Sequence, residues 1–170
     1  MRKIKAVPVT KENFAPFGRY FNFFDIPARE SEDFTAYTSI AELTDEPMNL
    51  GITVCRGADQ FTSVSMERHM LTEEPQFCGD GEMVLTVADS DPDRYPEAED
   101  VKAFIMKPGD VVVLAKGIWH DANHGTKEGH DVLYYFMATN KEPDNLREIE
   151  WVKISPEPVL VETGGDESGK

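Results

Sequence analysis

The fold is decided by the stretch Lys107-Pro-Gly-Asp-Val-Val-Val-Leu-Ala-Lys-Gly-Ile-Trp-His120. Pro108-Gly109-Asp110 is typical of a turn, and the apolar run at 111–114 behind it predicts a short buried strand. Lys116-Gly117 predicts a second turn or bulge that redirects the chain. His120 is therefore expected at a fixed point just beyond a buried strand.

Short runs of β-type residues continue on both sides of this stretch. Glycine, proline and aspartate separate them, which is typical of strands joined by turns. Repeated short strands of this kind predict an all-β sandwich or barrel. Thr10 is expected to cap a single helical turn that ends after Phe14. The expected strands are residues 4–9, 51–56, 60–69, 83–88, 101–107, 111–115 and 130–138.

Length and charge limit what the chain can be. Its 170 residues fit one domain, since domains commonly have roughly 100–200 residues. We expect this domain to span residues 1–162 and the apolar-free stretch 163–170 to be a disordered tail. The 17 basic and 32 acidic residues give a net charge of -15, which argues against nucleic acid and membrane surfaces as partners. A small anionic substrate would then need a local cationic pocket.

Cysteine usage and hydropathy predict a cytoplasmic protein. Cys55 and Cys78 are too few for a disulfide framework, and no signal-like segment is recognised. The longest apolar runs are far shorter than the roughly 20 residues of a membrane-spanning helix. We expect both cysteines to be small buried core residues.

A polar face is expected on the strand at 60–69. Because strand side chains alternate, Glu67 and His69 should share one face and Arg68 should point away. This face fits a ligand cavity inside a barrel, but it equally fits a solvated outer surface. The polar face would also carry Ser63 and Ser65, and the opposite face Thr62, Val64 and Met66.

Gly109, the apolar strand, Gly117 and His120 resemble the second motif of the cupin superfamily, in which two glycines flank a strand before a metal-binding histidine. Ala115 stands where cupins commonly have proline. The resemblance implies a cupin-like antiparallel β-barrel or jelly roll with one or two short helices.

By the same resemblance, Glu67-x-His69 stands where cupins have a His-x-His pair. Glu73 or Glu74, but not both, stands where they have a ligand glutamate. The resemblance implies a site for Ni, Zn, Mn or Fe made by Glu67, His69, His120 and one of these glutamates. A site that works without metal stays open.

Four ordered stretches together resemble the ureidoglycolate lyase family of purine (allantoin) degradation. Two departures flank the presumed site: Met70-Leu-Thr-Glu-Glu-Pro-Gln-Phe77 differs from the family pattern, and Asp121-Ala122 follows Trp-His where the family tends to have histidine and proline. The four stretches are Val7-Pro-Val-Thr-Lys-Glu-Asn-Phe-Ala-Pro-Phe-Gly18, Glu67-Arg-His69, Lys102-Ala-Phe-Ile105 and Gly117-Ile-Trp-His120.

The family resemblance implies a lyase that cleaves ureidoglycolate to glyoxylate and urea. Such a reaction needs a base, a proton donor for the leaving urea and an anchor for the carboxylate. The resemblance implies Arg56 as the anchor, with Lys116 second. His120 or His69 would move the proton and Glu67 would orient them or act as base; with a metal bound, the histidines would be ligands instead.

Two further expectations concern alternatives and assembly. The altered residues near the site leave open a diverged or non-catalytic cupin-like protein that binds a small carboxylate. A homodimer is the default, because an exposed sheet edge invites pairing. We expect His124 and His130 in a surface loop, Trp119 in the core, and Tyr134, Tyr135 and Phe136 as core packing.

Overall fold

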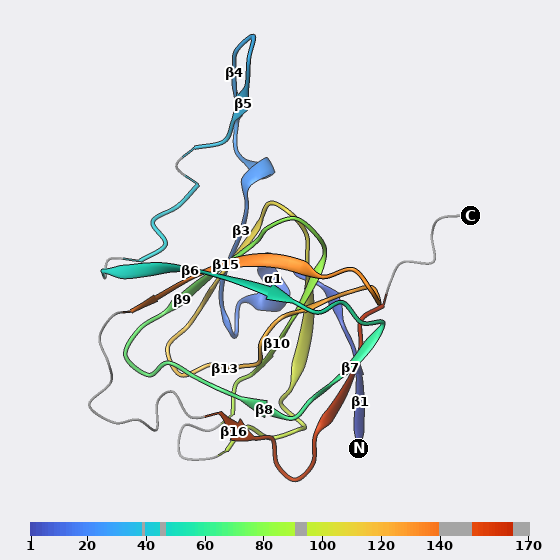
Figure 1. The fold of residues 1–170 in the computed structure, drawn as a ribbon. Coiled ribbons are helices and arrows are strands. Elements are labelled where there is room, and N and C mark those ends of the chain that lie inside the picture. Colours follow the sequence, from blue (N-terminus) through green and yellow to red (C-terminus); the bar gives the residue numbers. More distant parts are fainter. Residues whose placement is uncertain (39, 45–46, 91–94, 140–150, 165–170) are drawn as a thin grey trace.

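The computed structural model describes residues 1–38, 40–44, 47–90, 95–139 and 151–164. Within them the chain is almost entirely β-structure, arranged in two larger and three small sheets (Figure 1). Helix is confined to one α-helical turn, α1 (Lys11–Phe14), and one 3-10 turn, η1 (Phe23–Asp25). The predicted all-β fold with one or two short helices is confirmed. No helix in the described part of the chain has the length and apolarity needed to cross a bilayer.

The first large sheet contains the buried strand of the deciding stretch. Its order is β3-β12-β9-β15-β6, and all neighbours are antiparallel. β12 is buried along its whole length, because it has a strand on each side and packed residues on both faces. The members are β3 (Gly18–Asn22), β6 (Met48–Cys55), β9 (Glu74–Cys78), β12 (Asp110–Leu114) and β15 (Val132–Thr139).

The second large sheet has the order β13-β10-β11-β2, and β14 also pairs with β10. β10 is fully buried, as expected of a continuous apolar run covered on both faces. Leu85 and Met106 of this sheet share one apolar core with Val112 and Leu114 of the first. The members are β2 (Val7–Pro8), β10 (Met83–Ala88), β11 (Lys102–Met106), β13 (Trp119–His120) and β14 (His124–Gly125).

Three small sheets complete the structure. β1 (Arg2–Lys5) runs parallel to β17 (Val159–Glu162), which pairs antiparallel with β7 (Gln60–Ser63). β8 (Ser65–Met66) pairs with β16 (Val152–Lys153). The hairpin of β4 (Arg29–Glu30) and β5 (Thr35–Ala36) projects from the body (Figure 1).

Helix α1 begins as its sequence predicts. The Thr10 hydroxyl accepts a hydrogen bond from the Asn13 N–H at 3.2 Å, and the Asn13 side chain accepts one from the Thr10 N–H at 2.8 Å. This reciprocal capping box satisfies two backbone donors that the helix leaves unpaired. Phe14, at the end of the turn, is fully buried in the first core.

The single strand expected at 60–69 is wrong. The chain forms β7, passes Val64, and then forms β8 with a different partner strand. Val64 is 45% exposed whereas Met66 is fully buried, so the two do not share a face. The alternation is interrupted because the chain moves from the β17 sheet to the β16 sheet at this point.

Thr163, expected to begin a disordered tail, is instead packed into the structure. It is fully buried, its N–H donates to the carbonyl of Asp59, and its hydroxyl lies 2.7 Å and 3.0 Å from the carbonyl oxygens of Asp59 and Thr126. The packed part of the chain therefore extends past residue 162. The expectation for residues 165–170 lies outside the described residues.

Candidate functional site

Backbone pairing brings the segments Glu67-Arg-His69 and Gly117-Ile-Trp-His120 together. Glu67 and His120 form an antiparallel bridge, with N–H to carbonyl distances of 2.9 Å and 2.8 Å in the two directions. Two residues that exchange both hydrogen bonds lie directly opposite each other with side chains on one face. The Gly117 N–H donates to the His69 carbonyl at 2.8 Å and extends this pairing. His69 therefore joins the same site.

β9 supplies the fourth polar group. The Oε2 atom of Glu74 lies 2.7 Å from Nε2 of His69 and 3.3 Å from Nε2 of His120. The nearest oxygen of Glu67 is 3.9 Å from Nε2 of His120, and the two imidazole rings are 5.3 Å apart. One carboxylate thus bridges two histidines, and a second carboxylate lies beside them.

Two buried amides support Glu74 from behind. The Gln76 side chain donates to Oε1 of Glu74 at 2.8 Å, and the Asn123 side chain donates to Oε1 of Gln76 at 2.9 Å. Gln76 and Asn123 are each 1% exposed. Because both oxygens of Glu74 are engaged, its carboxylate is held in one orientation.

The tautomer of His120 follows from its backbone contact. Its Nδ1 atom lies 3.1 Å from the carbonyl oxygen of Ile118, which can only accept, so Nδ1 carries a hydrogen. Nε2 faces the cavity, fully buried and without a hydrogen-bond partner of good geometry. Nε2 is therefore the atom of His120 that can donate a proton at the site or, once deprotonated, bind a metal.

Charge and burial shift the acid–base properties of the site. Burial works to lower the pKa of His120, but the charge of Glu74 and then that of Glu67 outweigh it and raise the pKa to about 9. Burial works to raise the pKa of Glu74, but the two histidines outweigh it and hold it below its usual range. For Glu67 burial prevails over both histidines, so its pKa is raised.

These groups line a cavity of about 320 Å³, a size that suits a small molecule. Burial raises the pKa of Tyr134 to about 12, so its hydroxyl stays protonated at neutral pH. Among the described residues, no lysine or arginine lines the cavity. The lining residues are Thr53, Glu67, His69, Glu74, Gln76, His120, Asp121, Ala122, Tyr134, Phe136, Ala138 and Trp151.

The residues fit a divalent metal ion. Ligand atoms of Glu67, His69 and His120 all lie within 4.8 Å of one another, and Glu74 adds a carboxylate oxygen next to both histidines. Imidazole nitrogens with carboxylate oxygens suit Zn, Ni, Mn or Fe. The fully buried Nε2 of His120, which lies near two carboxylates but makes no hydrogen bond of good geometry, is the observation that favours a ligand here over a purely structural histidine.

Three of the residues expected at the site lie elsewhere. Glu73 is outside the cavity and pairs with Arg19 at 2.7 Å, so the structure places Glu74 and not Glu73 beside the histidines. Arg56 does not line the cavity: Cys55 before it points into the core, so Arg56 points outward, 83% exposed, and pairs with Asp131. Lys116 is exposed on the turn between β12 and β13.

Sequence reasoning missed several residues that line or support the cavity. Gln76 lies two positions after Glu74 on the same strand, so period-two alternation could have placed both on one face. Asp121 was noted only as a departure from the family, yet it accepts a hydrogen bond from Ser63 at 2.6 Å and lines the cavity. Tyr134 and Phe136, expected as core packing, share the cavity wall.

The other aromatic and histidine expectations have mixed outcomes. Trp119 is buried at 3% exposure, as expected, and so are both cysteines. His130 is exposed, but His124 is half-buried and stacks on Phe61 with ring centroids 3.7 Å apart. Burial lowers the pKa of His124, so the expectation of a surface role was wrong for this residue.

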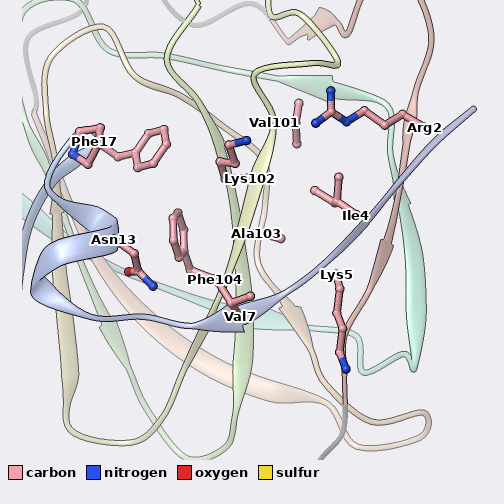
Figure 2. Close-up of a pocket in the computed structure, with 11 residues that line it drawn as sticks. Arg2, Ile4, Lys5, Val7, Asn13, Phe17, Val101, Lys102, Ala103 and Phe104 are labelled. Carbon is pink, nitrogen blue, oxygen red and sulfur yellow. The ribbon is translucent and has the colours of Figure 1, made fainter.

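A second, larger groove of about 580 Å³ lies along β1, α1 and β11 (Figure 2). Its lining contains no histidine, carboxylate or thiol, and most of its surface is apolar. The groups needed for proton transfer or metal binding are therefore found at the first cavity and not at this groove.

Fold and cavity together define a small all-β protein with a histidine–carboxylate centre. A model of the ureidoglycolate lyase family matches residues 1–159, so the chain belongs to that family and is a lyase. A ureidoglycolate lyase from Chelativorans sp. (strain BNC1) is 29% identical over 166 residues, covering 93% of this chain and 95% of that protein.

Two solved structures show a weaker likeness. A 3,4-ketoisomerase from Helicobacter canadensis is 12% identical with a TM-score of 0.49, over 74% of this chain and 86% of its own. A 3'-monoepimerase from Streptomyces bikiniensis, in complex with dTDP-quinovose, is 11% identical with a TM-score of 0.49, over 80% and 69%. At these values neither likeness bears on the activity of this chain.

Proposed function

We propose that this lyase cleaves ureidoglycolate to glyoxylate and urea in the cavity of Glu67, His69, Glu74 and His120. The family match supports the substrate, and the convergence of two histidines and two carboxylates on one small cavity supports the chemistry. In the reaction the substrate hydroxyl loses its proton, a C=O bond forms, the C–N bond breaks, and the leaving urea nitrogen takes up a proton. The site therefore needs one group that accepts a proton and one that donates a proton.

We assign the proton acceptor to Glu67. Its raised pKa makes it a stronger base than an exposed carboxylate, and it is backed by no hydrogen-bond chain like that of Glu74. His120 and His69 are held by Glu74, and the protonated hydroxyl of Tyr134, which also lines the cavity, can donate to the leaving urea. Each role uses an atom that reaches the cavity.

The charge of the cavity supports a divalent metal as cofactor. Glu67, Glu74 and Asp121 line it, and none of the described lining residues is a lysine or arginine. A carboxylate substrate would be repelled by this set alone. We propose that Glu67, His69, His120 and Glu74 hold the ion. Glu67 would then have two roles, as a ligand of the ion and as the group that accepts the substrate proton. Such an ion, when bound, would attract the substrate carboxylate and lower the pKa of its hydroxyl.

The test is glyoxylate release from racemic ureidoglycolate by purified protein, measured against uncatalysed decay, before and after exhaustive chelation and with Zn²⁺, Ni²⁺ or Mn²⁺ restored. We expect turnover that chelation abolishes and metal restores. His120→Ala should abolish turnover, whereas Glu73→Gln, which alters the neighbouring carboxylate outside the cavity, should keep it. Activity that survives chelation would overturn the metal assignment, and decay at the background rate under all conditions would overturn the substrate.

We also propose that two copies of the chain associate through β6. This strand is an edge of its sheet, and its outward residues Leu50, Ile52 and Val54 are 68%, 55% and 60% exposed. Tyr135, paired with Ile52 in the neighbouring strand, adds to this uncharged face. Each chain carries a net charge of -15, so two copies repel one another over most of their surfaces. The uncharged, apolar strand edge at β6 is therefore the surface that we expect to form the dimer interface.

A reducing, cytoplasmic location is proposed on the cysteines. Cys55 and Cys78 are both buried and unpaired, and burial raises their thiol pKa values to about 11 and about 12. Such thiols are poorly reactive and behave as small core residues.

A further inference from the structure

The groove along β1, α1 and β11 exists because the N-terminal strands separate. β2 pairs with β11 only at Phe104 and Ile105. One residue earlier in the chain, β1 has already turned away to pair with β17. The part of β11 at Lys102 and Ala103 therefore has no strand beside it on this edge, and a groove of about 580 Å³ opens there.

The floor of the groove is apolar. Ile4, Phe17, Ala103 and Phe104 line it together with other hydrocarbon groups (Figure 2). The amide of Asn13, a polar lining group, is already used: its nitrogen donates to the Pro8 carbonyl at 2.9 Å and its oxygen accepts from the Thr10 N–H. A ligand would thus meet hydrocarbon along the floor and charge only at the ends.

Cations occupy those ends. Figure 2 shows the charged groups of Arg2 and Lys102 on either side of Val101 near one end of the groove, and Lys5 at the other end. None of these three side chains takes part in an ion pair with the described residues, although the chain has nearly twice as many acidic as basic residues. Among the residues that the structure describes, no acidic side chain lines the groove to balance these three cations.

We propose that this groove binds a small amphipathic carboxylate, with the carboxylate between Arg2 and Lys102 and the hydrocarbon body on Ile4, Ala103 and Phe104. A guanidinium matches a carboxylate with two parallel hydrogen bonds, and an ammonium adds a second charge-assisted contact. A mostly apolar wall with a few placed polar groups is typical of small-molecule sites, and the volume lies in their usual range.

The groove is separate from the cavity of Glu67 and His120. The two sets of lining residues have no member in common. The proposal therefore does not depend on the ureidoglycolate reaction, and each can fail without the other.

The test uses hexanoate as the probe and follows backbone amide chemical shifts of the full chain by NMR during titration. Acetate, which lacks the hydrocarbon body, and 1-hexanol, which lacks the charge, are the matched ligands. Arg2→Ser and Lys102→Ser are the test variants. Lys3→Ser is the matched control, since Lys3 is on the same strand as Arg2, is exposed and does not line the groove.

We expect saturable shifts at Lys102, Ala103 and Phe104, with acetate and 1-hexanol binding at least tenfold more weakly. Arg2→Ser and Lys102→Ser should each weaken hexanoate binding about tenfold, as expected for the loss of one charge-assisted contact. Lys3→Ser and His120→Ala should leave it unchanged. Shifts confined to the residues around His120, or equal weakening by Lys3→Ser and Arg2→Ser, would overturn the proposal.

Discussion

Gln76 connects the candidate site to the protein interior through one side-chain amide. It donates to Glu74 and accepts from Asn123, and none of the three is more than 7% exposed. Glu74 in turn contacts both histidines. At the scale of single residues, the geometry of the site thus depends on a side chain that does not itself contact either histidine.

Gln76→Leu should destabilise the protein and weaken the site together. It leaves an oxygen of Glu74 and the amide nitrogen of Asn123 buried without partners, at about 1–3 kcal/mol for each such group. Urea unfolding of chelated protein measures the stability loss, and titration with Zn²⁺ should show affinity about 10–100-fold lower. Gln60→Leu, at an exposed position, is the control; equal stability of Gln76→Leu and wild type contradicts the argument.

His124 should make stability fall in mild acid. Its folded-state pKa lies below the ordinary value of 6.5 because it is buried, so the unfolded chain binds more protons in this range. Its contribution to stability is therefore lost as the pH falls through 6.5 toward the lowered folded-state pKa. His124→Phe keeps the stacking on Phe61 and cannot titrate.

The measurement is the unfolding free energy of wild type and His124→Phe at pH 8 and pH 5.5. The wild type should lose more stability than the variant between the two values. Identical losses in both proteins would show that another group carries the acid sensitivity.

At the scale of elements, the turn at Gly117 links the two histidines. Gly117 adopts a φ of +84°, a conformation that favours glycine. Its N–H donates a hydrogen bond to the carbonyl of His69, and His120 follows three residues later in the chain. A Cβ here would meet only the Sδ and Cε atoms of Met70, at 3.6 Å and 3.9 Å, so space is available and backbone strain alone opposes substitution.

Gly117→Ala should cost about 1–2 kcal/mol of stability from this strain and lower the rate of glyoxylate release. Gly129→Ala is the matched control, because Gly129 has a φ of +74° and no atom within 4 Å of the added Cβ. It should cost similar stability and leave the rate unchanged. Equal rates of glyoxylate release in the two variants would show that the turn at Gly117 does not affect the geometry of the site.

Sequence patterns predicted an element correctly where residues adjacent in the sequence determine its structure. The run at 83–88 became β10 with those bounds, and the Thr10 cap became α1, since both depend on adjacent residues. Arg56 was expected at the site but lies outside the cavity, because the direction of its side chain depends on where Cys55 packs, which no spacing in the sequence reveals. Gln76 was missed because a side-chain amide in a short strand indicates a role at a site only once the strand is known to be buried.

At the scale of the whole molecule, the uncharged face of β6 should control assembly. Ile52→Lys places a charge at its centre and should convert a dimer to a monomer, measured by light scattering after size-exclusion chromatography. Val64→Lys is the control, because Val64 is also exposed, at 45%, but lies outside this face. A wild-type protein that elutes as a monomer at high concentration contradicts the proposed association.

The parallel pairing of β1 with β17 has a consequence for synthesis on the ribosome. β1 is made early, but its partner at Val159–Leu160 is translated more than 150 residues later, which takes on the order of ten seconds or more at usual rates. Until then β1 and β7 both lack the strand that joins them. The nascent chain therefore cannot close its structure until Val159–Glu162 has emerged from the ribosome, when most of the strands before it have already been made.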